Sequence, residues 1–220
     1  MGDRFAVCFD GRAARTPGGR DLLLPTVALA ERIGAEWPKR EAGIDWASRL
    51  ATRLAFGALD AGPSETRSLV EGFVQLAEAD LLCYRAASPR ALARRQALTW
   101  GPILSRVEAR LDVRFALGAG IAPVAQDPAV AAAAKAWVDG LDRFSLVAAN
   151  AAARLFCSAI LAIALSEEML DADAVFAAAN LDESFQRETW GEDFEAAERH
   201  AKLLEEARGL AGFLAALRRP

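Results

Sequence analysis

The pattern of hydrophobic and polar positions divides the chain into a short opening with period two and a long remainder with helical period. Three short runs are candidate strands, Phe5–Phe9, Ala13–Thr16 and Leu22–Leu24, and in the first of them Phe5, Val7 and Phe9 alternate with Ala6 and Cys8. The turn sequences Asp10-Gly11 and Pro17-Gly18-Gly19 separate these runs, which is a hairpin signal. We therefore expect a small antiparallel β meander that packs against a helix, because so few strands are not stable alone.

Two helical patterns follow the meander. The first starts at Pro25-Thr26 and reaches Trp37, where Pro38 should end it. The second starts at Asp45 and is broken at Gly62-Pro63. These two helices could belong to the β-containing part or to the part that follows.

The remainder of the chain predicts helices with one exception. The exception is a short strand over Val113–Leu117, ended by Gly118 and Gly120. We expect helices from Ser64 as N-cap to Asp80, from Pro89 to Leu111, from Asp127-Pro128 onward, from Phe144 to Leu165, after Asp171 or Asp173, and from Gly191-Glu192 to about Leu217. The helix from Phe144 to Leu165 should form the buried core.

These elements predict an α+β fold. A small N-terminal antiparallel β-containing domain over residues 1–62 precedes a larger all-α helical domain over residues 63–220.

Composition restricts the class of protein. Hydrophobic residues make up 53% of the chain, which is enough for a core, and the net charge of −4 argues against a nucleic-acid binder. The most apolar stretch, Leu155–Leu165, is shorter than the roughly 20 residues that span a bilayer, so no membrane insertion is expected. The N-terminus lacks the pattern of a secretory signal, and three cysteines favour a reducing compartment. We expect a cytoplasmic protein, and the Ala- and Arg-rich composition fits a bacterial one.

The residues that catalysis, metals and cofactors require are sparse. His200 is the single histidine and should lie on a solvated helix face, and a phosphate-binding glycine loop is absent. Cys8, Cys83 and Cys157 lack the spacing of a metal site, and the last two lie in apolar contexts typical of buried thiols. We therefore predict no catalytic residue, no metal and no cofactor.

Acidic residues are concentrated between Leu181 and Glu195. Glu192 and Asp193 fall in the first turn of the last predicted helix, where the helix dipole favours acids. Trp190 lies among these acids at a corner between two helices, where it is either the edge of the core, the simpler explanation, or a partner contact. The other four tryptophans are better explained by helix packing.

Several segments, in order, resemble the F-type ATP synthase assembly chaperones. They are Phe9-Asp10-Gly11-Arg12 with Arg15-Thr16-Pro17, Leu24-Pro25-Thr26 leading to Ala35-Glu36-Trp37, Thr52-Arg53-Leu54 with Asp60, Asp80–Arg85, and Leu181–Asp193. The chain departs from the family pattern at Phe56, where the family usually has Asn, and at Phe185, which is often Trp. The family also usually has another strand before the hairpin.

The resemblance implies a non-enzymatic chaperone, and we expect it to be a monomer. Its partner would be the unassembled α subunit of the catalytic head, which it shields from aggregation until the β subunit joins. The implied contact residues are Gln186, Glu188, Trp190, Glu192 and Asp193, with Glu188 pairing with a client Arg or Lys and Trp190 as an apolar anchor. Two alternatives remain, an adaptor module with a different client and a small-molecule enzyme that uses the acidic cluster.

Overall fold

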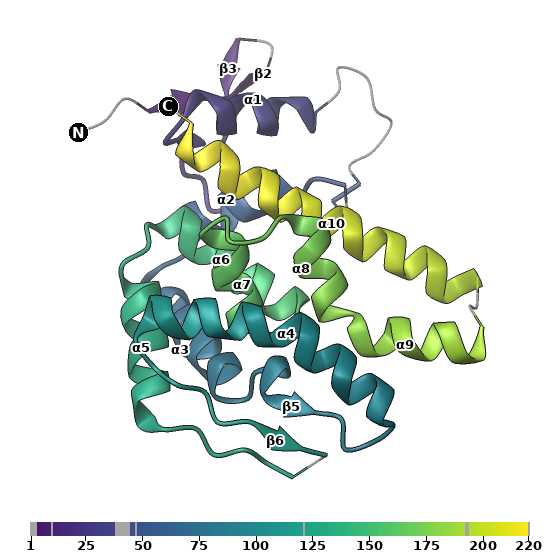
Figure 1. Ribbon diagram of the computed structural model, residues 1–220. Coiled ribbons are helices and arrows are strands. Elements are labelled where there is room, and N and C mark those ends of the chain that lie inside the picture. Colours follow the sequence, from purple (N-terminus) through teal and green to yellow (C-terminus); the bar gives the residue numbers. More distant parts are fainter. Residues whose placement is uncertain are drawn as a thin grey trace.

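The computed structural model describes residues 4–9, 11–37, 45–46, 48–120, 122–191 and 194–219. Short strands open the chain and helices make up most of the rest (Figure 1). The helices are α1 Val27–Ala35, α2 Leu50–Asp60, α3 Pro63–Glu78, α4 Arg90–Leu111, α5 Pro128–Asp139, α6 Arg143–Leu155, α7 Ala159–Ser166, α8 Ala172–Ala179, α9 Leu181–Trp190 and α10 Phe194–Arg218. The strands are β1 Phe5–Ala6, β2 Cys8–Phe9, β3 Arg12–Ala13, β4 Leu23–Leu24, β5 Tyr84–Arg85 and β6 Gly118–Ala119, and the 3-10 helix η1 Leu81–Cys83 precedes β5. The predicted α+β class is confirmed.

The opening strands pair differently from a simple meander. β1 pairs antiparallel with β4, and β2 pairs antiparallel with β3. Val7, between β1 and β2, is buried, and its carbonyl accepts the Ala14 N–H at 2.8 Å. The first apolar run is therefore divided between two partners. As expected, a helix covers it: α1, with Leu29 and Ile33 buried, contacts β1 and β4.

The start of α2 lies later than predicted. Glu36 accepts hydrogen bonds from the N–H groups of Ala51 and Thr52 at 2.7 and 2.8 Å. These bonds satisfy the first turn of a helix that begins at Leu50 rather than at Asp45. Trp46 consequently precedes the helix and is 44% exposed. Its ring still packs against Phe56 of α2, with ring centroids 6.3 Å apart, so the expected helix packing holds from a position outside the helix. The expected stop at Pro38 lies outside the described residues, and α1 ends at Ala35.

The N-cap of α3 is Gly62 rather than the predicted Ser64. Pro63 occupies the first helical position, where its missing N–H costs nothing. The Glu65 carboxylate in the first turn of α3 accepts the N–H of the N-cap residue Gly62 at 3.1 Å.

The core helix predicted over Phe144–Leu165 is wrong, because the chain breaks into α6 and α7. Cys157 adopts a left-handed φ of 50°, and Ser158 then caps α7 by accepting the Leu161 N–H at 3.0 Å. Cys157 is exposed in this break, which corrects the expectation of a buried thiol, whereas Cys83 is buried as expected. α7 itself is entirely apolar up to Ser166 and lies at the centre of the helical part, in contact with α3, α4, α6, α8 and α10.

Asp80 joins the end of α3 to this central helix. Its fully buried carboxylate accepts bonds from the Leu82 N–H at 3.0 Å, the Ser158 hydroxyl at 2.8 Å and the Ile160 N–H at 2.9 Å. Burial raises the pKa of Asp80 from 3.8 to about 6, against these hydrogen bonds, which lower it.

The strand predicted over Val113–Leu117 is also wrong. The Gln126 side chain bonds both the N–H and the carbonyl of Ala116, at 2.8 and 3.0 Å, and so replaces a strand partner there. The strand of this segment is β6, which begins at Gly118, directly after the end of the predicted range, and pairs in parallel with β5.

The C-terminal helix connects the two ends of the chain. α10 contacts α1, α2, α6, α7 and α8 (Figure 1). Thr26 caps α1 by accepting the Leu29 N–H at 3.1 Å and donates its hydroxyl to the Ala216 carbonyl at 2.7 Å. The boundary at residues 62 and 63 stays a prediction, and α2 on its N-terminal side contacts both α6 and α10.

Two large apolar side chains confirm the expected helix packing. Trp100 is fully buried, and its indole N–H donates to the Ala178 carbonyl at 2.8 Å. Trp137 of α5 stacks on Phe73 of α3 with ring centroids 5.4 Å apart. Among the described residues, none of the helices combines the length and apolar character needed to cross a membrane.

Candidate partner-binding site at the α9–α10 corner

The corner predicted as a partner contact lies where α9 ends and α10 begins (Figure 1). Acidic Asp182 and Glu183 occupy the first turn of α9, and basic Arg187 occupies the last, so both ends complement the helix dipole. Gly191 ends the helix with a φ of 91°, a conformation that glycine adopts without steric cost. The sequence Trp190-Gly191 therefore places the corner as predicted.

Glu188 is held by an arginine of another helix. Its two carboxylate oxygens accept bonds from Nη1 and Nη2 of Arg95 in α4, each at 2.7 Å. The Arg95 guanidinium also lies over the Phe185 ring, 5.3 Å from its centroid. The hydrogen bond from Arg95 lowers the pKa of Glu188, so this carboxylate is ionised at neutral pH. Both side chains are exposed, at 58% for Glu188 and 40% for Arg95, so the pair contributes little to stability and can be competed for.

A buried glutamine also joins α4 and α9. Gln96 is 1% exposed, donates from Nε2 to the Asp182 carboxylate at 2.7 Å, and accepts the Ala86 N–H at 2.7 Å. In the sequence, Gln96 falls at helical spacing between the apolar residues Leu92 and Ile103. A polar residue on an apolar stripe is the signal that could have found this bridge, because buried amides need partners.

The single histidine is half-buried rather than solvated. The His200 ring lies edge-on against Phe176 with centroids 4.7 Å apart, and its Nε2 is 3.3 Å from Nη2 of Arg187. His200 therefore packs α10 against α8 and the end of α9, which corrects the expectation of a solvated helix-face residue.

The structure separates the predicted contact residues into two groups. Gln186 and Glu188 are both exposed on α9. Residues two positions apart on a helix point in different directions, and Glu188 faces α4. Trp190 is the last residue of α9, and its side chain is not described. Glu192 and Asp193 lie outside the described residues.

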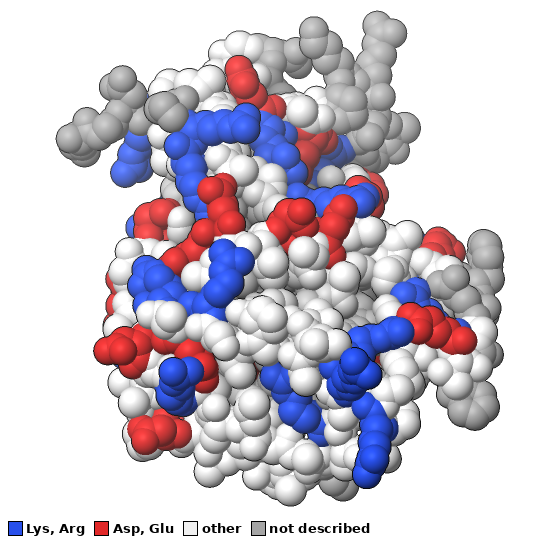
Figure 2. All heavy atoms as spheres, viewed as in Figure 1, with Lys and Arg blue, Asp and Glu red and all other residues white. Residues whose placement is uncertain are grey.

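Charged side chains of both signs are interspersed on the face seen in Figure 2, and wide uncharged areas lie between them. Among the described residues, three or more His, Cys, Asp or Glu side chains nowhere gather as a metal site would require. The arrangement at the corner offers exposed polar groups on rigid helices, which suits contact with another macromolecule.

Comparison with known proteins identifies the family. A family model described as ATP12 chaperone protein matches residues 1–108. The crystal structure of Atp12 from Paracoccus denitrificans superposes with a TM-score of 0.89 at 36% identity, covering 97% of this chain and 91% of that one. A crystal structure of a protein from Agrobacterium tumefaciens superposes with a TM-score of 0.91 at 34% identity, covering 98% of this chain and 81% of that one. The chain belongs to the ATP12 chaperone family.

Proposed function

We propose that this chain is an assembly chaperone of the F-type ATP synthase that binds the unassembled α subunit of the catalytic head. The similarity to Paracoccus Atp12 over 97% of the chain is the observation that carries the proposal. The chaperone would cover the surface that the β subunit later occupies, because exposed apolar interfaces invite wrong association. Such a role needs no catalytic group in the chaperone.

The client contact is assigned to the α9–α10 corner, with Gln186, Glu188, Trp190, Glu192 and Asp193 as its residues. Glu188 supplies an ionised carboxylate that Arg95 holds in place. A basic client side chain would either displace Arg95 from this carboxylate or add to the pair. Either event costs little free energy because the Arg95–Glu188 pair is exposed.

Co-purification with the separately expressed α subunit tests the function. A soluble one-to-one complex with α, and none with the β subunit, is the expected result. Binding to neither subunit, with a folded α subunit, would overturn the proposal. Capture of a different client in its place would support the adaptor alternative.

Glu188→Lys tests the contact residue. We expect this variant to remain folded and to bind the α subunit about tenfold more weakly, because a like charge then meets the client's basic group. Fluorescence anisotropy with labelled α subunit measures the loss, and circular dichroism checks the fold.

The charge swap Glu188→Arg with Arg95→Glu is the matched control for this variant. The swap restores an ion pair between α4 and α9 but reverses the charge that meets the client. Recovery of wild-type affinity in the swap would show that Glu188 acts only by joining the two helices. Continued loss of affinity supports direct contact.

A further inference from the structure

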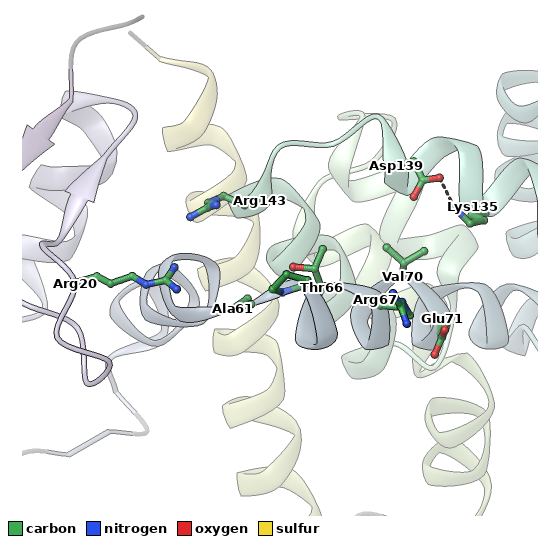
Figure 3. A pocket seen from close by; sticks show the side chains of 11 residues that line it. Arg20, Ala61, Thr66, Arg67, Val70, Glu71, Lys135, Asp139 and Arg143 are labelled. Carbon is green, nitrogen blue, oxygen red and sulfur yellow. Dashed lines mark hydrogen bonds and ion pairs between the residues drawn. The ribbon is translucent and has the colours of Figure 1, made fainter.

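A cleft of about 770 Å³ opens on a different part of the molecule from the α9–α10 corner. Its walls come from the turn that carries Arg20, from the start of α3, from the end of α5 and from the first residue of α6 (Figure 3). The charged residues of this cleft are Arg20, Arg67, Lys135, Arg143, Glu71 and Asp139. We call it the arginine cleft.

The arginine cleft is basic although the whole chain is acidic. Its four cationic and two anionic side chains leave a net charge of +2, whereas the chain carries −4. Lys135 and Asp139 neutralise each other in an ion pair at 2.5 Å, drawn in Figure 3. Within the part of the chain that the structure describes, Arg20, Arg67 and Arg143 pair with no carboxylate, although other arginines of this protein do.

The positive charge of the arginine cleft comes from its side chains rather than from helix dipoles. The N-terminal ends of α3 and α6 border it at Pro63 and Arg143, but the C-terminal ends of α2 and α5 border it at Ala61 and Asp139, so the partial charges of the helix ends offset one another. Arg20 donates a hydrogen bond to the Leu59 carbonyl, which holds its guanidinium beside the end of α2. Ala61, Pro63 and Val70 supply apolar wall between the charges.

The charges extend along the cleft rather than converging on one point. Figure 3 shows Arg20 and Arg143 near the beginning of α3, with Arg67 farther along that helix. Side chains on one face of an extended peptide recur about every 7 Å, so such a peptide can follow charges that are spread along the cleft in a way that a compact anion cannot. Guanidinium groups bind carboxylates through two parallel hydrogen bonds, which adds geometric selectivity.

We propose that the arginine cleft binds an extended acidic segment of a partner polypeptide, with its carboxylates on Arg20, Arg67 and Arg143. The arginine cleft is then a second docking surface, separate from the α9–α10 corner. The inference does not depend on which client the chaperone serves, because it follows from the charge and shape of the cleft.

A labelled peptide of alternating Glu and Ala tests the proposal by fluorescence anisotropy at low ionic strength, because salt screens exposed charges. We expect the peptide to bind and the matched Gln-Ala peptide not to bind. The double variant Arg67→Gln with Arg143→Gln should lower the affinity about tenfold or more. The control Arg90→Gln with Arg94→Gln removes the same charge from exposed positions at the start of α4 and should change the affinity less than about twofold.

Three results would overturn the proposal. One is an absence of binding by the acidic peptide, and another is an equal loss of affinity in the two double variants. The third is displacement of the peptide by millimolar inorganic phosphate, which would make the cleft a site for a small anion. Photo-cross-linking adds a readout that does not depend on the variants: a reactive group on the peptide should label segments that contain Arg67 or Arg143, and labelling confined to other segments counts against the cleft.

Discussion

Asp80 connects two backbone segments of the core through a buried carboxylate whose charge is unfavourable there. Its carboxylate caps the start of α7 and bonds η1, so two backbone segments depend on it. The same burial that makes these bonds strong opposes its charge and raises its pKa to about 6. The sequence suggested that a helix ends at Asp80, but the buried partners, about 80 residues away in Ser158 and Ile160, could not be read from local pattern.

We predict that Asp80 makes stability depend on pH in a defined direction. Because its pKa is higher in the folded than in the unfolded state, its contribution is greatest below about pH 4 and is lost as pH rises towards about 6. The unfolding free energy of the wild type minus that of Asp80→Asn should therefore fall by up to about 3 kcal/mol over this window. Urea unfolding of both proteins between pH 4 and pH 7 measures the difference, which would stay constant if Asp80 did not titrate there.

The cysteines should differ in reactivity in the native protein. Burial raises the pKa of the Cys83 thiol to about 12, so it carries almost no thiolate at pH 8, whereas Cys8 and Cys157 are exposed. A thiol reagent should modify Cys8 and Cys157 rapidly and Cys83 only after denaturant is added. Mass spectrometry of digested protein locates the modified residues, and early labelling of Cys83 would contradict its burial.

At the scale of elements, local signals predicted most helix ends but not the breaks that tertiary contacts impose. Asp127 and Asp171 cap α5 and α8 as expected, because each side chain bonds an N–H within its own first turn. Sequence pattern does not reveal the break between α6 and α7, because an apolar run hides it and because Asp80, which accepts the Ser158 hydroxyl at the break, lies 78 positions away. The contact of Glu188 with Arg95 was missed for a similar reason, since the two lie 93 positions apart.

Replacing the capping residues of α7 and α8 should separate the contribution of a local helix cap from that of the distant bond to Asp80. Asp171→Ala removes an exposed cap and should lower the unfolding free energy by about 1 kcal/mol. Ser158→Ala removes a cap and also deprives the buried Asp80 of a donor, so a loss of about 2–4 kcal/mol is expected. Equal losses in urea unfolding would mean that the Asp80 bond contributes nothing.

For the whole molecule, composition and periodicity were sufficient to predict the class of fold, because a hairpin signal and repeated helical stripes are local properties. Composition and periodicity could not predict that the last helix packs against the first two. The contacts of α10 with α1 and α2, including the Thr26 bond to Ala216, join residues 190 positions apart.

The chaperone without its client should be a monomer. The large apolar side chains that are exposed among the described residues, Val27, Trp46, Leu98 and Leu117, come from four separate segments. So few large exposed apolar side chains fall short of the apolar area that a stable self-interface buries. Light scattering coupled to size exclusion should give a mass near 23.5 kDa at micromolar concentration, and a constant mass twice as large would contradict the prediction.

The position of α10 has a consequence for how the protein is made. A ribosome releases α1 and α2 well before α10, the helix on which both of them pack. At about 5–20 residues per second, the N-terminal helices wait roughly 8–30 s for α10. During synthesis the chaperone is thus itself an unassembled chain with uncovered apolar helices until α10 has emerged.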